Sequence, residues 1–385
     1  MFYQFPEIKN FSDLKPYILE NSSITVSYKD DYIVVNYNVA DKETFPDLSE
    51  GDIARYRREM RGIIFDLSGN VLRRPFQKFF NLGEREELLL GNIDFDEHHV
   101  ILDKVDGSMV TPLMSLGQLR FATKAGITDM SPAIEAYVDQ ARAHYRSFCE
   151  YMIDINHTPI FEYVSRDNRI VLDYKEQNLI LLGIRNNLTG NYISYKQQII
   201  YAYPYYIPVV KEVYNSKNSI DDFVRYIYNE KDIEGVVVRF DNGHMLKIKT
   251  EWYVNIHRAK DACLHEKRVI EMILDSKTDD VLAFLPPDDA KKLSEYSNAF
   301  LSGLNERRKD VVDSIKRFKG SITRKEYALE VAPHFNSLLN AIIFKCWDNE
   351  MLVWKTIQEI VRRHLGSQTD VDKVRFLWGD ATWKF

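Results

Sequence analysis

Lys104, Asp106 and Gly107 stand close together at a spacing that could support covalent chemistry. They follow the apolar, β-branched run at residues 100–103, so we expect the lysine at a strand end, entering a turn. A lysine amine placed there could act as a nucleophile once it is neutral. Alone the K-x-D-G pattern is weak, because a surface lysine before an Asx turn is commoner.

Charged residues in further segments follow in a fixed order along the chain. They are Arg61 in R-G-I-I-F, Glu162 in F-E-Y, Glu234 in E-G-V-V, and Lys247 and Lys249 in K-I-K. The two lysines alternate on one expected strand, so both should point to one face. The two glutamates stand within expected strands, where buried carboxylates need partners. An exposed strand face and a strand-edge salt bridge are the alternatives, and the shared order of the motifs argues against both.

A lysine nucleophile needs positive charge around it. An ordinary lysine has a pKa of ~10.4, so only about one in a few thousand is neutral at pH 7. Burial and nearby cations disfavour the ammonium form, and Lys247, Lys249 and a divalent metal would supply those cations beside Lys104. The same charges would stabilise a phosphate in the transition state. Mg²⁺ suits such a site, because it keeps several waters and binds few carboxylates.

The ordered set K-x-D-G, F-E-Y, E-G-V-V and K-x-K resembles the covalent nucleotidyltransferase superfamily of polynucleotide ligases and messenger-RNA capping guanylyltransferases. Within it the chain is most similar to the RNA ligase 1 family of T-even bacteriophages. The similarity rests on residues 36–38, 61–63, 78–82, 168–172, 190–195 and 247–253, and it extends over most of residues 24–258.

The resemblance implies that Lys104 takes AMP from ATP and that Lys247 and Lys249 act at the phosphate. Glu162 would lie on the ribose or metal side of the nucleotide. Glu234 would coordinate Mg²⁺, with Mn²⁺ as its substitute. Lys104, Lys247, Lys249 and Arg61 form the implied catalytic set, and Glu162 and Glu234 join them in binding the cofactor.

Further nucleotide contacts are implied at Tyr37, Arg61 and Lys78. Phe80 could either support adenine binding or fill the hydrophobic core, and the sequence favours neither interpretation. Supporting positions at the site or for RNA are assigned to Asp106, Gly107, Tyr253 and Lys124.

Two acidic or basic features stand apart from this set. Asp279 and Asp280 match an acidic pair that the family places at a second divalent ion, and a helix N-terminal role is the alternative. The family also has a lysine directly before the glycine of the segment at residues 123–126. Here Ala125 holds that position and Lys124 precedes it. Either Lys124 serves from a shifted strand end, or the contact is missing.

The elements that must hold these residues change character near residue 255. Before it, short alternating runs and turn dipeptides predict antiparallel strands, with Asn242-Gly243 the clearest hairpin turn. Two helices interrupt them. One has Ser131 as its expected N-cap and Pro132 in its first turn, and it continues as a single apolar stripe to Met152, while a shorter one begins at Ser219. The expected strands are residues 24–28, 32–37, 63–66, 71–73, 100–103, 119–123, 160–164, 179–184, 236–240 and 245–248.

After residue 255 helical periodicity takes over. We therefore expect an α+β fold, with an antiparallel-sheet adenylyltransferase domain at residues 1–254 and an all-α domain at residues 255–385. Basic residues cluster at residues 307–309, 316–319 and 324–325. Solvated helix faces are the usual explanation of such clusters, and a phosphate-binding surface is the alternative. By analogy, the helical domain would recognise RNA.

Composition limits the class of protein. The 385 residues carry a formal net charge of -6, so any nucleic-acid surface must be local. Three widely spaced cysteines give no zinc or redox motif and predict free thiols in a reducing compartment. No signal peptide or membrane span is expected, which favours the cytoplasm, that of the host if a phage encodes the chain.

The function predicted from these features is an ATP-dependent RNA ligase. It would join 5′-phosphate and 3′-hydroxyl ends through lysyl-AMP and RNA-adenylate, as a monomer. The resemblance suggests repair of nicked tRNA anticodon loops, with a kinase-phosphatase preparing the ends. A GTP-dependent capping guanylyltransferase and a non-catalytic RNA-binding protein on the same fold are the alternatives. The intact lysines and glutamates weaken the second, and a helical rather than all-β appendage weakens the first.

Overall fold

The computed structural model describes residues 4–18, 23–215, 219–334, 336–379 and 381–385. The chain forms two compact units, Met1–Val254 and Asn255–Phe385, which meet where the sequence pattern changes. The first unit is built mainly from antiparallel sheets and the second from helices, so the expected α+β class is confirmed. In the part of the chain that the structure describes, no helix is long and apolar enough to cross a membrane.

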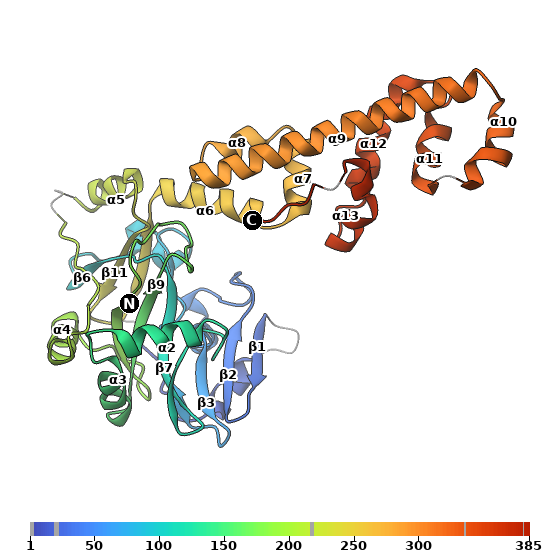
Figure 1. Ribbon diagram of the computed structural model, residues 1–385. Coiled ribbons are helices and arrows are strands. Elements are labelled where there is room, and N and C mark those ends of the chain that lie inside the picture. The colour runs from blue at the N-terminus through green and yellow to red at the C-terminus, as the bar shows by residue number, and fades with distance from the viewer. Residues whose placement is uncertain (1–3, 19–22, 216–218, 335, 380) are drawn as a thin grey trace. The chain divides into compact units, whose positions relative to one another are not determined.

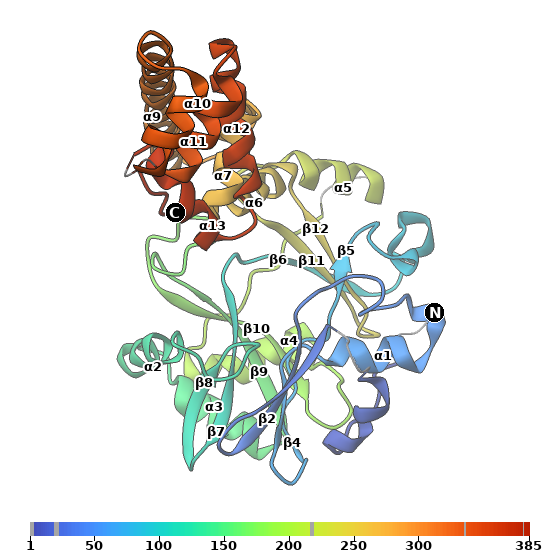
Figure 2. The same ribbon diagram turned by 90° about the vertical axis from the view of Figure 1, so that its right-hand side faces the viewer.

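Three four-stranded sheets form the first unit (Figures 1 and 2). All neighbouring strands are antiparallel except β5 and β12, which run parallel. The first sheet has the order β1 (Ile24–Tyr28), β2 (Tyr32–Tyr37), β3 (Ile63–Asp66) and β4 (Val71–Arg73). The second has β10 (Asn178–Asn186), β9 (His157–Val164), β7 (Ser108–Ser115) and β8 (Gln118–Ala122). The third has β5 (Phe80–Asn81), β12 (Met245–Lys249), β11 (Gly235–Phe240) and β6 (His99–Asp103).

Helices cover the sheets of this unit and bury its apolar side chains. In Figure 2, α2 (Ser131–Gln140) and α3 (Tyr145–Asp154) lie against the second sheet. α5 (Ile220–Asn229) packs on β11 and β12 of the third, and its N-cap is Ser219 as expected. The remaining helices, α1 (Asp52–Glu59) and α4 (Tyr195–Ala202), were not expected from the sequence.

The stripe that follows Ser131 is two helices rather than one, so that expectation was wrong. The backbone of Ala141 turns to an extended conformation, and α3 begins four residues later, after His144 donates its N–H to the Tyr205 carbonyl. Both helices still bury their share of the stripe in one core. Ser131 is also not the N-cap. It is the first residue of α2, and its hydroxyl accepts the N–H of Thr128.

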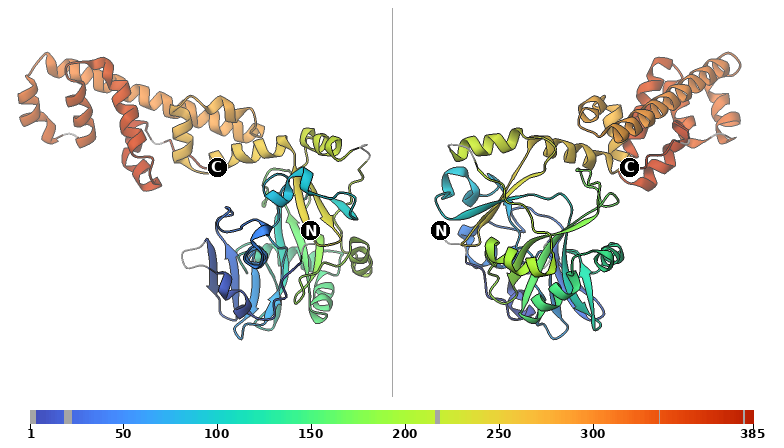
Figure 3. Two further views of the ribbon diagram at one scale, coloured as in Figure 1. Left: turned by 180° about the vertical axis from the view of Figure 1, so that it is seen from behind. Right: turned by 60° about the vertical axis from the view of Figure 1, so that its left-hand side comes forward.

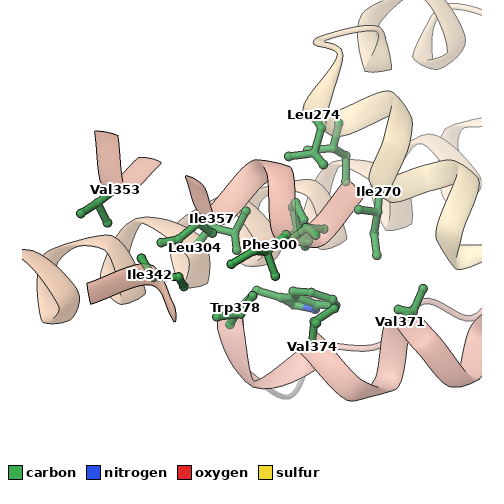
Figure 4. Close-up of a cluster of buried hydrophobic side chains, with 14 of the residues drawn as sticks. Ile270, Leu274, Phe300, Leu304, Ile342, Val353, Ile357, Val371, Val374 and Trp378 are labelled. Carbon is green, nitrogen blue, oxygen red and sulfur yellow. The ribbon is translucent and has the colours of Figure 1, made fainter. Parts of the chain in front are cut away.

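The named elements of the second unit are all helices, joined by short loops in its described residues, and the long α9 is its main axis (Figure 3). Its core gathers side chains from widely separated helices, as Figure 4 shows for Ile270, Phe300, Ile357 and Trp378. The helices are α6 (Glu251–Cys263), which begins at the end of the first unit, α7 (Glu266–Leu274), α8 (Thr278–Leu282), α9 (Pro287–Lys319), α10 (Arg324–Glu326), α11 (Ser337–Cys346), α12 (Val353–Arg363) and α13 (Gln368–Val374). All three cysteines of the chain are buried free thiols.

Candidate active site

Lys104 directly follows β6, at the strand end where the sequence pattern predicts it. Asp103, the last residue of β6, pairs with Val236 of β11, and the Lys104 N–H donates to the Gly235 carbonyl at 3.0 Å. The lysine backbone is thereby fixed to the neighbouring strand. Its Nζ lies 2.7 Å from Oε2 of Glu234, on the residue just before β11.

Glu234 joins the two lysines of the site through one carboxylate. Its Oε1 lies 3.0 Å from Nζ of Lys249, the last residue of β12, and its side chain is 4% exposed. Burial of one carboxylate between two ammonium groups satisfies its charge. The sequence suggested that Glu234 lies within a strand. It does not, because β11 starts one residue later, at Gly235.

Gly235 is required at this junction. Its φ is +141°, and a Cβ added there would lie 2.0 Å from the Ile248 carbonyl oxygen on β12. The close approach holds β11 against β12 and so brings Glu234 next to Lys249. Gly107 serves a similar purpose after Lys104, since a Cβ there would lie 2.4 Å from the Tyr163 carbonyl oxygen of β9.

Asp106 of the K-x-D-G segment positions the loop rather than facing the cavity. Its Oδ2 accepts the N–H groups of Val171 and Leu172, both at 2.8 Å. Its Oδ1 accepts the hydroxyl of Tyr253 at 2.7 Å. The Tyr253 ring in turn lies 4.9 Å from Nζ of Lys249. This buried network ties the lysine loop to the end of β12.

A cavity of about 520 Å³ opens beside Lys104 within the first unit. Both charged and apolar side chains line it. The charged lining residues are Arg61, Asp103, Lys104, Lys124, Glu162, Arg239 and Lys247. The apolar lining residues include Phe76, Phe79, Leu182, Val210, Val237 and Met245. Such a cavity suits a ligand with an anionic end and a flat, apolar end.

Burial and neighbouring charge change the protonation of two groups in the cavity wall. Burial, together with Arg61, Lys78, Lys104 and Lys249, holds the pKa of Lys247 well below its usual value. Burial also raises the pKa of Glu162 to about 8, although Lys104 acts against that rise. No hydrogen bond or ion pair joins the Glu162 carboxylate to a residue that the structure describes, so this oxygen pair is open to a ligand.

A second cationic group surrounds Tyr37. The Nζ atoms of Lys78 and Lys124 lie 5.1 and 5.0 Å from its ring, and Lys78 Nζ is 3.5 Å from its hydroxyl. Burial raises the pKa of Tyr37, but Arg61, Lys78 and Lys124 outweigh it and the pKa is lowered. Burial lowers the pKa of Lys78. Lys124 therefore reaches this group despite its shifted place in the sequence, and this position favours the first of the two alternatives.

Phe80 does not have the nucleotide-facing position that one interpretation gave it. It is 1% exposed and packs in the core of the third sheet, with the Arg85 guanidinium 4.1 Å from its ring. The preceding Phe79 lines the cavity instead, with Lys247 Nζ 4.8 Å from its ring. Adjacent residues in an extended segment face opposite sides. Because β5 has only two residues, the sequence pattern is too short to show which phenylalanine faces the cavity.

Asp279 and Asp280 lie in the second unit, exposed in the first turn of α8. That position favours the helix N-terminal alternative. Across the described parts of the chain, no three or more His, Cys, Asp and Glu side chains are grouped to hold a metal. A metal bound mainly by substrate phosphates needs only one or two carboxylates, and Glu162 and Glu234 fit that donor set.

Arg239 is a cavity residue that the sequence analysis missed, along with Phe76 and Phe79. The available signal was strand alternation. Arg239 stands two residues after Val237 on β11, so both side chains share one face, and both line the cavity.

Comparison with known proteins agrees with this geometry. A family model described as RNA ligase matches residues 59–253, which contain most of the cavity wall. A putative RNA ligase of Thermovibrio ammonificans is 28% identical over 279 residues, covering 68% of each chain. RNA ligase 1 of bacteriophage TS2126 is 25% identical over 277 residues, 70% of this chain and 68% of that one. A putative bifunctional polynucleotide kinase/RNA ligase of Autographa californica nuclear polyhedrosis virus is 28% identical over 253 residues, 59% of this chain and 35% of the viral protein.

Proposed function

This chain belongs to the RNA ligase family, and from that premise we propose that it seals RNA ends with ATP by carrying AMP on Lys104. One observation carries the proposal. Lys104 is held at a strand end beside a cavity that both cationic and apolar side chains line, and these suit the phosphates and the base of a nucleotide. Neither the capping guanylyltransferase nor the non-catalytic alternative is supported by the similar proteins.

The first step would form the lysyl-AMP. Lys104 gives a proton to water, and its neutral Nζ attacks the α-phosphorus of ATP. A nitrogen–phosphorus bond forms, the bond to the bridging oxygen breaks, and pyrophosphate leaves with the electron pair. Lys247 lines the same cavity and would donate a hydrogen bond to the phosphate oxygens, which stabilises the charge that grows on them in the transition state.

The second and third steps would pass AMP through the RNA. An oxygen of the RNA 5′-phosphate attacks the lysyl-AMP phosphorus, and Lys104 leaves and regains a proton. The 3′-hydroxyl of the other end then attacks the activated 5′-phosphate, loses its proton and displaces AMP. The product is an ordinary phosphodiester.

Magnesium fits the proposed site. Glu234, beside Lys104, and Glu162, which lines the cavity, would hold it, and phosphates and waters would complete its shell. When bound, Mg²⁺ supplies positive charge to the phosphates, and Mn²⁺ could replace it. The cations around Tyr37 would hold the outer phosphates of ATP, because Lys78 and Lys124 both face that ring.

The helical unit would choose the RNA. The exposed faces of α9 carry Arg308, Lys309, Lys316 and Arg317, and such a row can neutralise phosphates without reading sequence. Nicked tRNA is the proposed substrate. A kinase-phosphatase would prepare its ends, and the viral relative named as a kinase joined to an RNA ligase is in keeping with that pairing.

The test separates transfer of AMP from sealing. Lys104→Ala should fail to join 5′-phosphate RNA with ATP, yet it should still seal RNA already adenylylated at its 5′ end. Lys175→Ala, which removes an exposed lysine elsewhere in the same unit, should do both. If folded Lys104→Ala seals neither substrate while the control seals both, the role assigned to Lys104 is too narrow.

A further inference from the structure

Arg239 is a buried cation with little to bind inside the protein. Its side chain projects from β11 into the cavity wall and is 5% exposed. Its Nη1 donates to Oε1 of Gln198 at 3.3 Å, while its Nη2 has no hydrogen-bond partner among the described residues. No ion pair joins it to a carboxylate that the structure describes.

Such an arrangement is costly unless a ligand completes it. A guanidinium carries five N–H donors and cannot accept a hydrogen bond. Buried arginines are normally paired, because an unpartnered buried charge destabilises the fold. Burial lowers the pKa of Arg239 to about 10, so the group stays charged at neutral pH. A hydrogen-bond acceptor that enters the cavity would satisfy it.

The strand register shows which end of a nucleotide Arg239 can meet. On β12, Lys249 pairs with Gly235, Lys247 with Val237, and Met245 with Arg239. At roughly 3.3 Å per residue, the four steps from Gly235 to Arg239 span about 13 Å. Lys104 therefore lies level with Gly235, Arg239 lies four residues farther along the strand, and Lys247 lies between these two levels.

The surroundings of Arg239 are apolar, as a nucleobase requires. Val237 and Met245 flank it on the same sheet face, and Phe76 and Leu182 complete this part of the wall. A phosphate placed here would be far from Lys104, whereas a base would be sandwiched between apolar side chains. The hydrogen-bond acceptors of adenine are its ring nitrogens, because adenine, unlike guanine, has no carbonyl oxygen.

We propose that Arg239 determines nucleobase binding by donating a hydrogen bond to a ring nitrogen of the purine of ATP. The inference rests on the proposed function and deepens it. Gln198, which is fully buried and also donates to the Leu181 carbonyl at 3.2 Å, holds the guanidinium in place. Nη1 is engaged there, and Nη2, which has no partner among the described residues, is available to the base.

Deaza analogues of ATP test the contact atom by atom. Lysyl-nucleotide formation is measured with ATP, 1-deaza-ATP, 3-deaza-ATP and 7-deaza-ATP, using the unmodified chain and Arg239→Met. One analogue should lower kcat/KM of the unmodified chain by about ten- to a hundredfold, mainly through KM, as expected for a hydrogen bond to a charged donor. With ATP, the kcat/KM of Arg239→Met should be lower than that of the unmodified chain by a similar factor. Replacing ATP with that analogue should not lower the kcat/KM of the variant further. Arg225→Met, at an exposed arginine of α5, should behave as the unmodified chain.

Several outcomes would overturn the inference. In one such outcome, all three deaza analogues support lysyl-nucleotide formation by the unmodified chain as well as ATP does. This outcome can be observed without any variant. The kcat/KM of Arg239→Met could also fall by the same factor when the analogue replaces ATP, which would place the base contact at another residue. Alternatively, 2′-deoxy-ATP could lower kcat/KM of the unmodified chain while no deaza analogue does.

Thermal unfolding separates a ligand-binding role from a structural one. Removal of a poorly satisfied buried charge should leave the unfolding temperature of Arg239→Met unchanged or higher. A large fall would assign Arg239 to the fold and refute the inference. If the unmodified chain forms no adduct with ATP at all, the proposed function fails first, and that result is distinct from any pattern among the analogues.

Discussion

Glu162 should make the protein less stable as the pH rises, and Glu162→Gln should remove that dependence. Burial is the main reason that its pKa rises from 4.5 in the unfolded chain to about 8 in the folded one. A carboxyl group with a raised pKa binds more protons in the folded state. Stability is therefore fully retained below the unfolded pKa and is lost progressively as the pH rises from about 4.5 to about 8.

The size of the effect follows from that interval. With 1.36 kcal/mol for each pKa unit, the free energy of unfolding should fall by up to about 3 kcal/mol between roughly pH 5.5 and 8.5 because of this group alone. Glu162 is partly exposed, so solvent reduces this value. In a domain of this size, each kcal/mol changes the unfolding temperature by about 2–4 °C.

The assay is thermal unfolding of the unmodified chain and Glu162→Gln at the two pH values, with a chelator and without nucleotide. The variant should be the more stable protein, and its advantage should be several degrees larger at the higher pH. Glu150→Gln, at an exposed glutamate, should show no such change in advantage. An advantage of Glu162→Gln that is the same at both pH values, or a variant that is less stable at high pH, would refute the reasoning.

Two other predictions concern the frame of the site. Gly235→Ala should lower the unfolding temperature and abolish adduct formation, since its Cβ would meet the Ile248 carbonyl at 2.0 Å, whereas Gly91→Ala, with open space around it, should do neither. Wild-type activity in Gly235→Ala, measured by labelling with ATP, would show that the β11–β12 contact is not needed. A chain that ends near residue 255 should still form lysyl-AMP, because the first unit has its own cores and cavity, but should change its choice among RNA substrates. The same ranking of RNAs with and without the helical unit would contradict this division of labour.

The sequence was sufficient wherever local pattern and chemistry coincide. Lys104 lies at its strand end, and the Asn242-Gly243 hairpin joins β11 to β12, because each depends on a few adjacent residues. Strand β7 was missed because Pro112 and polar residues interrupt its apolar pattern, and only its partners β8 and β9 define it.

Features set by distant contacts could not be predicted. The break after α2 depends on packing against Tyr205, some sixty residues away, and nothing in the apolar stripe marks it. The exchange of Phe79 for Phe80 follows from the parallel pairing of β5 with β12. The burial of Arg239 depends on Gln198 and on cavity residues that lie far from it in the sequence, such as Phe76 and Leu182.

The most direct test of the central claim is identification of the adduct by mass spectrometry. The protein is incubated with magnesium and ATP or GTP, digested, and its peptides are searched for a bound nucleotide. We predict AMP on Lys104 alone, formed from ATP and not GTP, removed by added pyrophosphate and absent from Lys104→Ala. Folded protein that carries no nucleotide, carries GMP, or carries AMP on another residue would contradict the account.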